Sequence, residues 1–249
     1  MQNSKALQLP QAEFSLLQRF ADHLKSSLGE NLHSLIVYGS SVRGGFNSET
    51  SDINLMIVLK VSTPQAHEVI REGWTGKLRI EPFVVEYSGM HRAARVFALK
   101  FISIQNHYHI LAGQNPFSEL NIPDELRLLL TEQEARNLRM RMVRAYIRFA
   151  HNSEGYKKFL QTLSSKVVIV LSDILSCAKI DLPEQFAERL AIFESEFEID
   201  TSILTRLKQL KESENTLTEA EAKEIHAKLL PIIKKGINWM ESKWPTLPL

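Results

Sequence analysis

The sequence predicts an α+β fold, with a mixed β-sheet flanked by helices in the first half and an all-α helical bundle in the second. Two short apolar runs rich in β-branched residues, 35–38 and 53–59, enclose a loop dominated by Gly and Ser. Short runs of this kind, bounded by turn residues, indicate strands. A third such run lies within residues 77–89, whereas the chain beyond residue 123 shows helical periodicity.

A connection between the two halves is predicted at residues 113–123, which read GQNPFSELNIP. Gly, Asn and two prolines in so short a segment are typical of a linker between domains. We therefore expect a first domain over residues 1–115 and a second domain over residues 116–249.

Helices are expected to cover the sheet of the first domain. Residues 10–28 carry apolar side chains at helical spacing and stop at Gly29. Residues 64–72 follow Thr63, whose hydroxyl suits an N-cap. A longer helix is expected over residues 90–111, which also show apolar side chains at helical spacing.

The second domain is expected to be helical along its length. Its most apolar segment, residues 156–178, predicts the core helix of the bundle, and Thr218 with Glu221 forms a capping box at the start of the last helix. The expected helices cover residues 131–150, 156–178, 183–197, 201–211 and 218–243, the last with a kink at Pro231.

The Gly-Ser loop and the strand after it hold the residues that we expect to carry chemistry. Gly39 and Ser40 end the first apolar run, and the loop beyond them is rich in residues that leave backbone N–H groups able to face an anion. Asp52 and Asn54 stand two positions apart, so both project from the same face of one strand. That face presents two oxygen ligands to one cation. The segment therefore predicts a site for phosphate plus metal.

This arrangement resembles the nucleotidyltransferase superfamily, whose signature is Gly-Ser, a gap of about this length, Asp-x-Asp on a strand, and a third acid on a later strand. The likeness is greatest to the aminoglycoside and lincosamide nucleotidyltransferases, which carry a C-terminal helical bundle. The resemblance implies that Gly39 and Ser40 hold a nucleoside triphosphate and that Asp52 and Asn54 hold Mg²⁺ or Mn²⁺. It further implies that a nucleoside monophosphate passes to an acceptor hydroxyl as pyrophosphate leaves.

The chain departs from this signature at Asn54, where the family has its second acid. An amide oxygen can coordinate Mg²⁺ but brings no charge. At an effective dielectric constant of about 20, two unit charges roughly 4 Å apart interact by about 4 kcal/mol, and each ~1.4 kcal/mol is a factor of ten. We therefore expect a loss of at least tenfold in metal occupancy or rate, with Glu49, Glu86 or a substrate phosphate left open as the source of the missing charge.

Two residues compete for the third acid, Glu81 and Glu86. They have opposite parity along one strand and therefore point to opposite faces. We favour Glu81, because residues 80–85, IEPFVV, resemble the Leu-Glu-Val segment that carries this acid in the aminoglycoside branch, where it is a metal ligand or a general base. Pro82 directly after it indicates an edge strand or a bulge.

Several arginines are candidates for binding phosphate. Arg43 lies within the Gly-Ser loop. Arg141, Arg144 and Arg148 fall within one arc of a predicted helix. Two interpretations stay open for these three: they reach triphosphate oxygens bidentately, or they form a solvated face paired with acids of a neighbouring helix.

Charge and cysteine content limit the class of protein. The chain has 30 basic and 29 acidic residues, a balance that argues against general binding of nucleic acid. A single cysteine, Cys177, allows no intramolecular disulfide and favours a reducing cytoplasm. No apolar run reaches the roughly 18 residues of a membrane span, and the N-terminus lacks the apolar region of a signal peptide. We expect a cytoplasmic protein without a membrane partner.

Two functions follow from these observations. The first is a Mg-dependent nucleotidyltransferase that acts on a hydroxyl of a small molecule or of a protein. The second, motivated by Asn54, is a catalytically degenerate module that binds a nucleotide or a partner protein without turnover. The acceptor, the choice of NTP and the oligomeric state, including a homodimer, are left open. For the enzyme we assign Asp52 and Glu81 to catalysis, Gly39, Ser40 and Arg43 to the nucleotide, and Asp52, Asn54 and Glu81 to the metal.

Overall fold

The computed structural model describes residues 6–44, 46–48, 51–183, 185–212 and 217–246 of the chain. The chain divides into two compact units, residues 1–122 and residues 123–249. The predicted domain boundary after residue 115 lies seven residues earlier than this division. Residues after 115 belong to the first unit because the Phe117 ring is buried against Tyr108, with ring centroids 5.0 Å apart.

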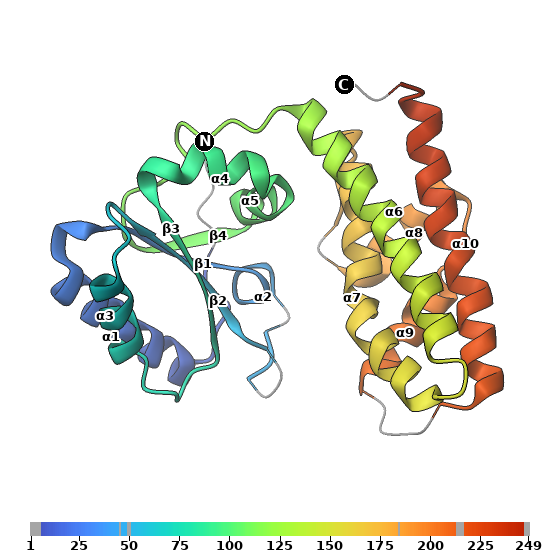
Figure 1. Cartoon of the computed structure of the whole chain (residues 1–249), viewed down its shortest axis with the longest axis horizontal. Coiled ribbons are helices and arrows are strands. Elements are labelled where there is room, and N and C mark those ends of the chain that lie inside the picture. The colour runs from blue at the N-terminus through green and yellow to red at the C-terminus, as the bar shows by residue number, and fades with distance from the viewer. Residues whose placement is uncertain (1–5, 45, 49–50, 184, 213–216, 247–249) are drawn as a thin grey trace. The chain divides into compact units, whose positions relative to one another are not determined.

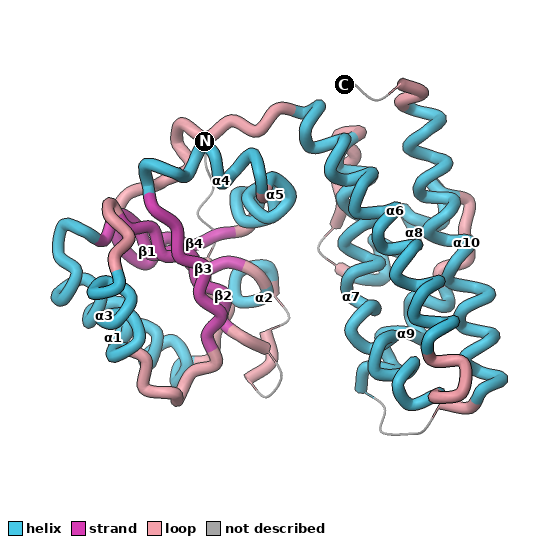
Figure 2. The backbone as a smooth tube through the Cα atoms, viewed as in Figure 1, coloured by secondary structure: helices cyan, strands magenta, loops and turns pink. Residues whose placement is uncertain are grey.

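The first unit is built on a four-stranded mixed sheet, as the sequence predicted (Figure 2). Strand β1 is antiparallel to both β2 and β4, whereas β2 and β3 are parallel. Across the sheet the strand order is β3-β2-β1-β4, so β3 and β4 are the edges. The strands cover β1 Leu32–Tyr38, β2 Ile53–Leu59, β3 Ile80–Glu86 and β4 Tyr108–Gly113.

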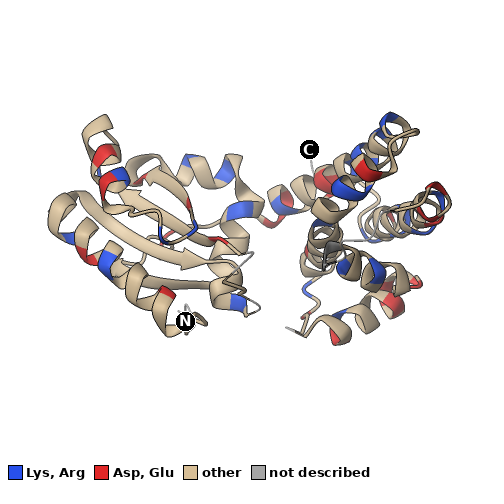
Figure 3. Cartoon of the chain, turned by 90° about the horizontal axis from the view of Figure 1, so that it is seen from below, with Lys and Arg blue, Asp and Glu red and all other residues tan. Residues whose placement is uncertain are grey.

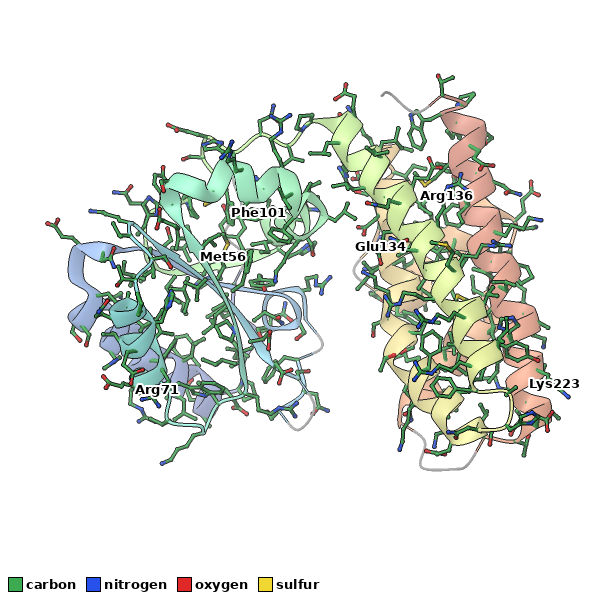
Figure 4. The ribbon with its side chains drawn as sticks, viewed as in Figure 1. Met56, Arg71, Phe101, Glu134, Arg136 and Lys223 are labelled. Atoms are coloured by element: carbon green, nitrogen blue, oxygen red, sulfur yellow. The ribbon has the colours of Figure 1, made fainter. Side chains whose placement is uncertain are left out.

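Helices cover both faces of this sheet (Figure 1). On one face lie α1 (Gln11–Leu28) and α3 (Pro64–Gly73), which bury side chains such as Leu17 against the odd-numbered residues of β1 and β2. On the other face lie α4 (Met90–Val96) and α5 (Ala98–Asn106), where Phe101 packs near Met56 (Figure 4). Each fully buried side chain of this size contributes roughly 1.5–3 kcal/mol, so two-sided burial stabilises the central strands.

The helix predicted over residues 90–111 is divided into two helices at Phe97 and is wrong beyond Asn106. Helix α4 ends at Val96, α5 ends at Asn106, and the next residues form strand β4 instead. The reason is pairing with β1, in which Tyr108 aligns with Tyr38 and buries its ring in the core beneath α5. A backbone ladder with a distant strand outweighs local helical periodicity here.

The second unit contains only helices in its described residues. The predicted helices are all present, although α6 starts at Asp124 rather than near residue 131, because Asp124 and Glu125 suit a first helical turn after Pro123. The predicted capping box of Thr218 and Glu221 is confirmed at the start of α10. The helices are α6 Asp124–Arg148, α7 Ser153–Cys177, α8 Phe186–Phe197, α9 Ser202–Glu212 and α10 Glu219–Lys243.

Helix α7 is the core helix of the bundle, as predicted. It is long and apolar enough to cross a membrane by length and composition, but half of its most apolar stretch is buried inside the protein. Helix α6 is joined to its neighbours by ion pairs: Arg136 lies 2.7 Å from Glu241 of α10, and Glu134 lies 3.0 Å from Lys166 of α7 (Figure 4). Acidic and basic residues are interspersed over both units (Figure 3).

Candidate functional site

The site begins at the turn after β1. Gly39 has φ 82° and ψ −146°, a conformation that residues with a side chain rarely adopt. Its carbonyl oxygen accepts hydrogen bonds from the backbone N–H groups of Val42 (3.1 Å) and Arg43 (2.9 Å), which closes the one-turn helix α2, Ser40–Arg43. A Cβ atom at Gly39 would stand 2.9 Å from Nδ2 of Asn54. Glycine is therefore needed here both for the backbone angles and for the close approach of Asn54.

A row of side chains crosses the sheet beside this turn. Tyr38 of β1 pairs with Asn54 of β2, and Asn54 pairs with Glu81 of β3. Residues in register on adjacent strands point to the same face, so these three side chains are neighbours. Asp52 precedes Asn54 by two positions, directly before the first residue of β2, and continues the same face. The structure thus brings the Gly39 turn, Asn54 and Glu81 together at one end of the sheet, on the face that α4 and α5 cover.

The phenol of Tyr38 is buried and lies within the electrostatic influence of Glu81. Burial, together with the negative charge of Glu81, raises the pKa of Tyr38 to about 12. Tyr38 is 9% exposed, whereas Glu81 is exposed to solvent. This row of side chains therefore begins with the buried phenol of Tyr38 and ends with the solvent-exposed carboxylate of Glu81.

Asp52 forms an ion pair that the sequence alone did not reveal. Its Oδ1 atom accepts a hydrogen bond from Nε of Arg79 over 3.0 Å, and the two side chains are 47% and 56% exposed. Arg79 stands just before β3 as Asp52 stands just before β2, and the parallel register places them side by side. Arg79 also precedes Glu81 by two positions, so it extends from the same face of that strand. A guanidinium thus stands among the carboxylates of the site.

Glu86 lies elsewhere and has a different role. It pairs with Leu59 at the far end of β3, where its carboxylate accepts hydrogen bonds from the backbone N–H of Ser62 (2.9 Å) and from Oγ of Ser88 (2.6 Å). These two bonds lower the pKa of Glu86. The carboxylate therefore ties the loop after β2 to the end of β3. Pro82 lies on an edge strand, as its position in the sequence indicated.

Three further residues belong to the Gly-Ser loop. Arg43 ends α2 with an exposed side chain that is engaged in an interaction. Glu49, one of the candidates for the missing charge, lies outside the described residues. Ser41 was not singled out from the sequence: it is fully buried, and within the described part of the chain its Oγ atom is the one buried side-chain polar atom without a hydrogen-bond partner.

The donor groups at this end of the sheet are of the oxygen type that a hard cation takes. Asp52 and Glu81 offer carboxylate oxygens, Asn54 offers an amide oxygen, and Mg²⁺ in proteins is commonly held by one or two carboxylates together with phosphates of the substrate. Among the described residues no group of three or more His, Cys, Asp and Glu side chains is placed to hold a metal ion. A cation would also compete with Arg79 for Asp52. The site is therefore poorer in charge than one with an acid at position 54.

Sequence reasoning missed Arg79 and Tyr38. The signal for Arg79 was present in its parity with Glu81, but its pairing with Asp52 requires the parallel alignment of β2 and β3. Tyr38 read as part of an apolar strand, and only the pairing of β1 with β2 places its phenol beside Asn54. Both relationships join residues that are far apart in the chain.

Comparison with known proteins supports the fold. No family model and no curated protein matches the sequence. Among solved structures, the spectinomycin adenyltransferase AAD(9) from Enterococcus faecialis, solved with ATP and spectinomycin, matches with a TM-score of 0.57 and 14% sequence identity. The match covers 92% of this chain and 99% of the adenyltransferase. The chain therefore has the fold of a nucleotidyltransferase with a C-terminal helical region, in agreement with the resemblance read from its sequence.

Proposed function

We propose that this protein is a nucleotidyltransferase, which moves a nucleoside monophosphate from an NTP to a hydroxyl group of a small molecule or of a protein. The observation that carries the proposal is the convergence of the Gly39 turn, Asn54 and Glu81 in the fold of an ATP-using adenyltransferase. ATP is accordingly the first nucleotide to test, and small polyhydroxylated molecules are the first acceptors. We expect the protein to act in the cytoplasm.

Each residue of the site has a role in this reaction. The turn at Gly39 and Ser40 receives the triphosphate, and Arg43 contributes positive charge beside it. Glu81 is exposed at the edge of the sheet. It accepts the proton of the acceptor hydroxyl while the oxygen of that hydroxyl attacks the α-phosphorus. The bond between the α-phosphorus and the bridging oxygen breaks, and pyrophosphate leaves with the electron pair.

Metal binding belongs to the same proposal. Asp52, Asn54 and Glu81 would hold Mg²⁺ or Mn²⁺, and the bound ion would neutralise charge on the phosphates. Arg79 supplies further positive charge next to Asp52. Positioning and charge stabilisation account for most of the catalysis expected of such a site.

Pyrophosphate release tests the proposal. The full-length protein is incubated with ATP, GTP, CTP or UTP, with Mg²⁺ or Mn²⁺, across a panel of hydroxylated acceptors. Transfer that depends on one nucleotide and one acceptor class supports the enzyme. Asp52→Ala should then reduce the rate by at least about tenfold, the factor that corresponds to ~1.4 kcal/mol in the barrier. An unchanged rate in this variant would remove the assignment of the site.

A second candidate function is nucleotide binding without turnover. It is favoured by Asn54 in place of the second acid and by the ion pair that already engages Asp52. Under this alternative, the wild-type protein binds an NTP with measurable affinity and releases no pyrophosphate. Wild-type transfer at any reproducible, Asp52-dependent rate excludes it.

A further inference from the structure

A groove in the second unit is lined by four cations over an aromatic floor. It is an open groove between α6 and α7, which pack against each other, and its volume is about 580 Å³. Cavities of 300–1,000 Å³ are of the size that holds small organic ligands. Among the residues that the structure describes, no Asp or Glu lines it. We refer to it as the basic groove, and its principal residues are Arg141, Arg144, Arg148, Lys158, Phe149 and Phe159.

The cations of the basic groove are not neutralised within the described part of the chain. Arg141, Arg144 and Lys158 form no ion pair there, and the guanidinium of Arg148 lies over the ring of Phe149, 5.8 Å from its centroid. Several other cations of the bundle are paired with acids. Their acidic partners lie within 4.0 Å, as in the pairs Arg136–Glu241, Lys166–Glu134, Arg206–Glu224, Lys223–Glu219 and Lys228–Glu224. Arg141, Arg144 and Arg148 are exposed, as the interpretation of a solvated face expected, but the pairing with acids of a neighbouring helix that it also expected is wrong.

The arginines are spaced to engage an extended anion. Arg141, Arg144 and Arg148 stand at positions i, i+3 and i+7 of one helix, so they share a face over two turns, about 10 Å in length at 1.5 Å per residue. Lys158 reaches the same groove from α7. A guanidinium matches the geometry of phosphate oxygens and can bind two at once, whereas Lys acts as a point charge. A chain of phosphates satisfies this row better than a single carboxylate does.

The floor of the basic groove is held in place by a close contact between the two helices. A Cβ atom at Gly155 would stand 2.7 Å from Cδ1 of Phe149, so only glycine lets this ring lie against the first turn of α7. Phe159 follows one turn later on the same side, stacked with Tyr156 at 6.1 Å between ring centroids. Aromatic faces of this kind stack on flat rings such as nucleobases.

We propose that the basic groove binds a nucleoside polyphosphate. The phosphates contact Arg141, Arg144 and Arg148, and the base stacks on Phe149 and Phe159. The phosphates account for the arginines of the groove, and the base accounts for its phenylalanines. The binding inference is argued from the second unit alone, and only the assignment of the nucleotide as a co-substrate rests on the proposed function. The bound nucleotide has two sources: a regulatory nucleotide, or the co-substrate of the transfer reaction.

The test locates binding on the full-length protein. Arginine side chains are modified with phenylglyoxal and mapped by peptide mass spectrometry, with and without ATP, inorganic tripolyphosphate or adenosine. We expect ATP to protect Arg141, Arg144 and Arg148 while Arg139, on the same helix but outside the groove, reacts at an unchanged rate. Tripolyphosphate should protect at higher concentration than ATP, and adenosine should not protect.

Calorimetry on matched variants completes the test. Arg144→Gln/Arg148→Gln should weaken ATP binding at least about tenfold, since hydrogen bonds to charged groups each contribute measurably to affinity. Arg139→Gln/Lys234→Gln removes the same charge from exposed positions outside the groove and should leave ATP affinity unchanged. Equal losses in both variants, or full reactivity of the three groove arginines in the presence of ATP, would overturn the proposal. So would protection by single-stranded RNA and not by ATP, which would make the groove a nucleic-acid surface.

A parallel assay separates this inference from the proposed function. If the groove arginines are protected while no NTP releases pyrophosphate, the proposed function fails and the groove stands. If pyrophosphate is released without protection, the groove fails and the function stands. Loss of protection in Asp52→Ala identifies the bound nucleotide as the co-substrate, and unchanged protection in that variant identifies a separate regulatory nucleotide.

Discussion

Asp52 and Arg79 form a 3.0 Å ion pair at the ends of two parallel strands, next to the acid and the amide of the candidate site. Two consequences follow from this geometry. The guanidinium places positive charge where a polyphosphate is proposed to bind, and it engages the carboxylate that a metal ion would need. Arg79 and a metal ion would therefore compete for the carboxylate of Asp52.

The first prediction concerns Arg79→Gln. Both side chains of the pair are about half exposed, so the change should alter the free energy of unfolding by no more than about 1 kcal/mol. It frees Asp52, so the concentration of Mg²⁺ or Mn²⁺ needed for half-maximal nucleotide binding or turnover should fall. Metal titration by calorimetry measures this. Arg95→Gln, an exposed arginine on α4, is the control, and a higher metal requirement in Arg79→Gln would contradict the competition.

The second prediction concerns Asn54→Asp. Restoring a carboxylate beside Glu81 should raise the affinity for Mn²⁺ at least about tenfold, because one added charge near a cation outweighs ~1.4 kcal/mol at an effective dielectric of about 20. If the wild type is an enzyme, the rate should rise as well. Asn121→Asp adds the same charge on a connection outside the site and should leave Mn²⁺ affinity as it is. Equal gains in both variants would mean that the effect is one of net charge.

The third prediction concerns Gly39→Ala. A positive φ and a Cβ only 2.9 Å from Nδ2 of Asn54 should destabilise the fold by about 1–3 kcal/mol. Nucleotide binding should weaken with it, since Asn54 must move. Gly89→Ala is the matched control, with negative φ and no atom of a described residue within 4 Å of the added Cβ, and it should be neutral or stabilising by up to about 1 kcal/mol. Urea denaturation compares them, and equal stability of the two variants would show that the turn relaxes freely.

The fourth prediction concerns the titration of Tyr38. Its pKa is raised to about 12 in the folded protein, first by burial and then by Glu81, whereas a tyrosine in the unfolded chain ionises near 10. The unfolded state therefore loses its proton first, and the stability that Tyr38 contributes is lost as pH rises from about 10 toward 12. Ultraviolet titration against Tyr38→Phe isolates this phenol.

Glu81→Gln tests the effect of the Glu81 charge on the pKa of Tyr38. Removing the negative charge should lower the pKa of Tyr38 while burial keeps it above 10. Glu86→Gln, at the other end of β3, should leave the Tyr38 titration in place. An unchanged Tyr38 pKa in Glu81→Gln would mean that the carboxylate of Glu81 points away from Tyr38 and Asn54.

Much of this protein could be predicted from local patterns in its sequence. The apolar runs on either side of the Gly-Ser loop, the amphipathic helices and the helical second half follow from side-chain periodicity, which a short window contains. The spacing of Asp52 and Asn54 also sets their common face by itself, because a strand alternates with period two.

The tertiary structure decided the relationships that join distant segments. Strand β4 forms where helical periodicity was read, because pairing with β1 satisfies its backbone and buries Tyr108. The alignment of β2 with β3 places Glu81 beside Asn54, sends Glu86 to the other end of the strand, and sets Arg79 against Asp52. The basic groove likewise needs α7 packed on α6, with Gly155 under the ring of Phe149. Strand register and helix packing depend on the free energy of the whole chain, so they cannot be predicted from a short segment of sequence.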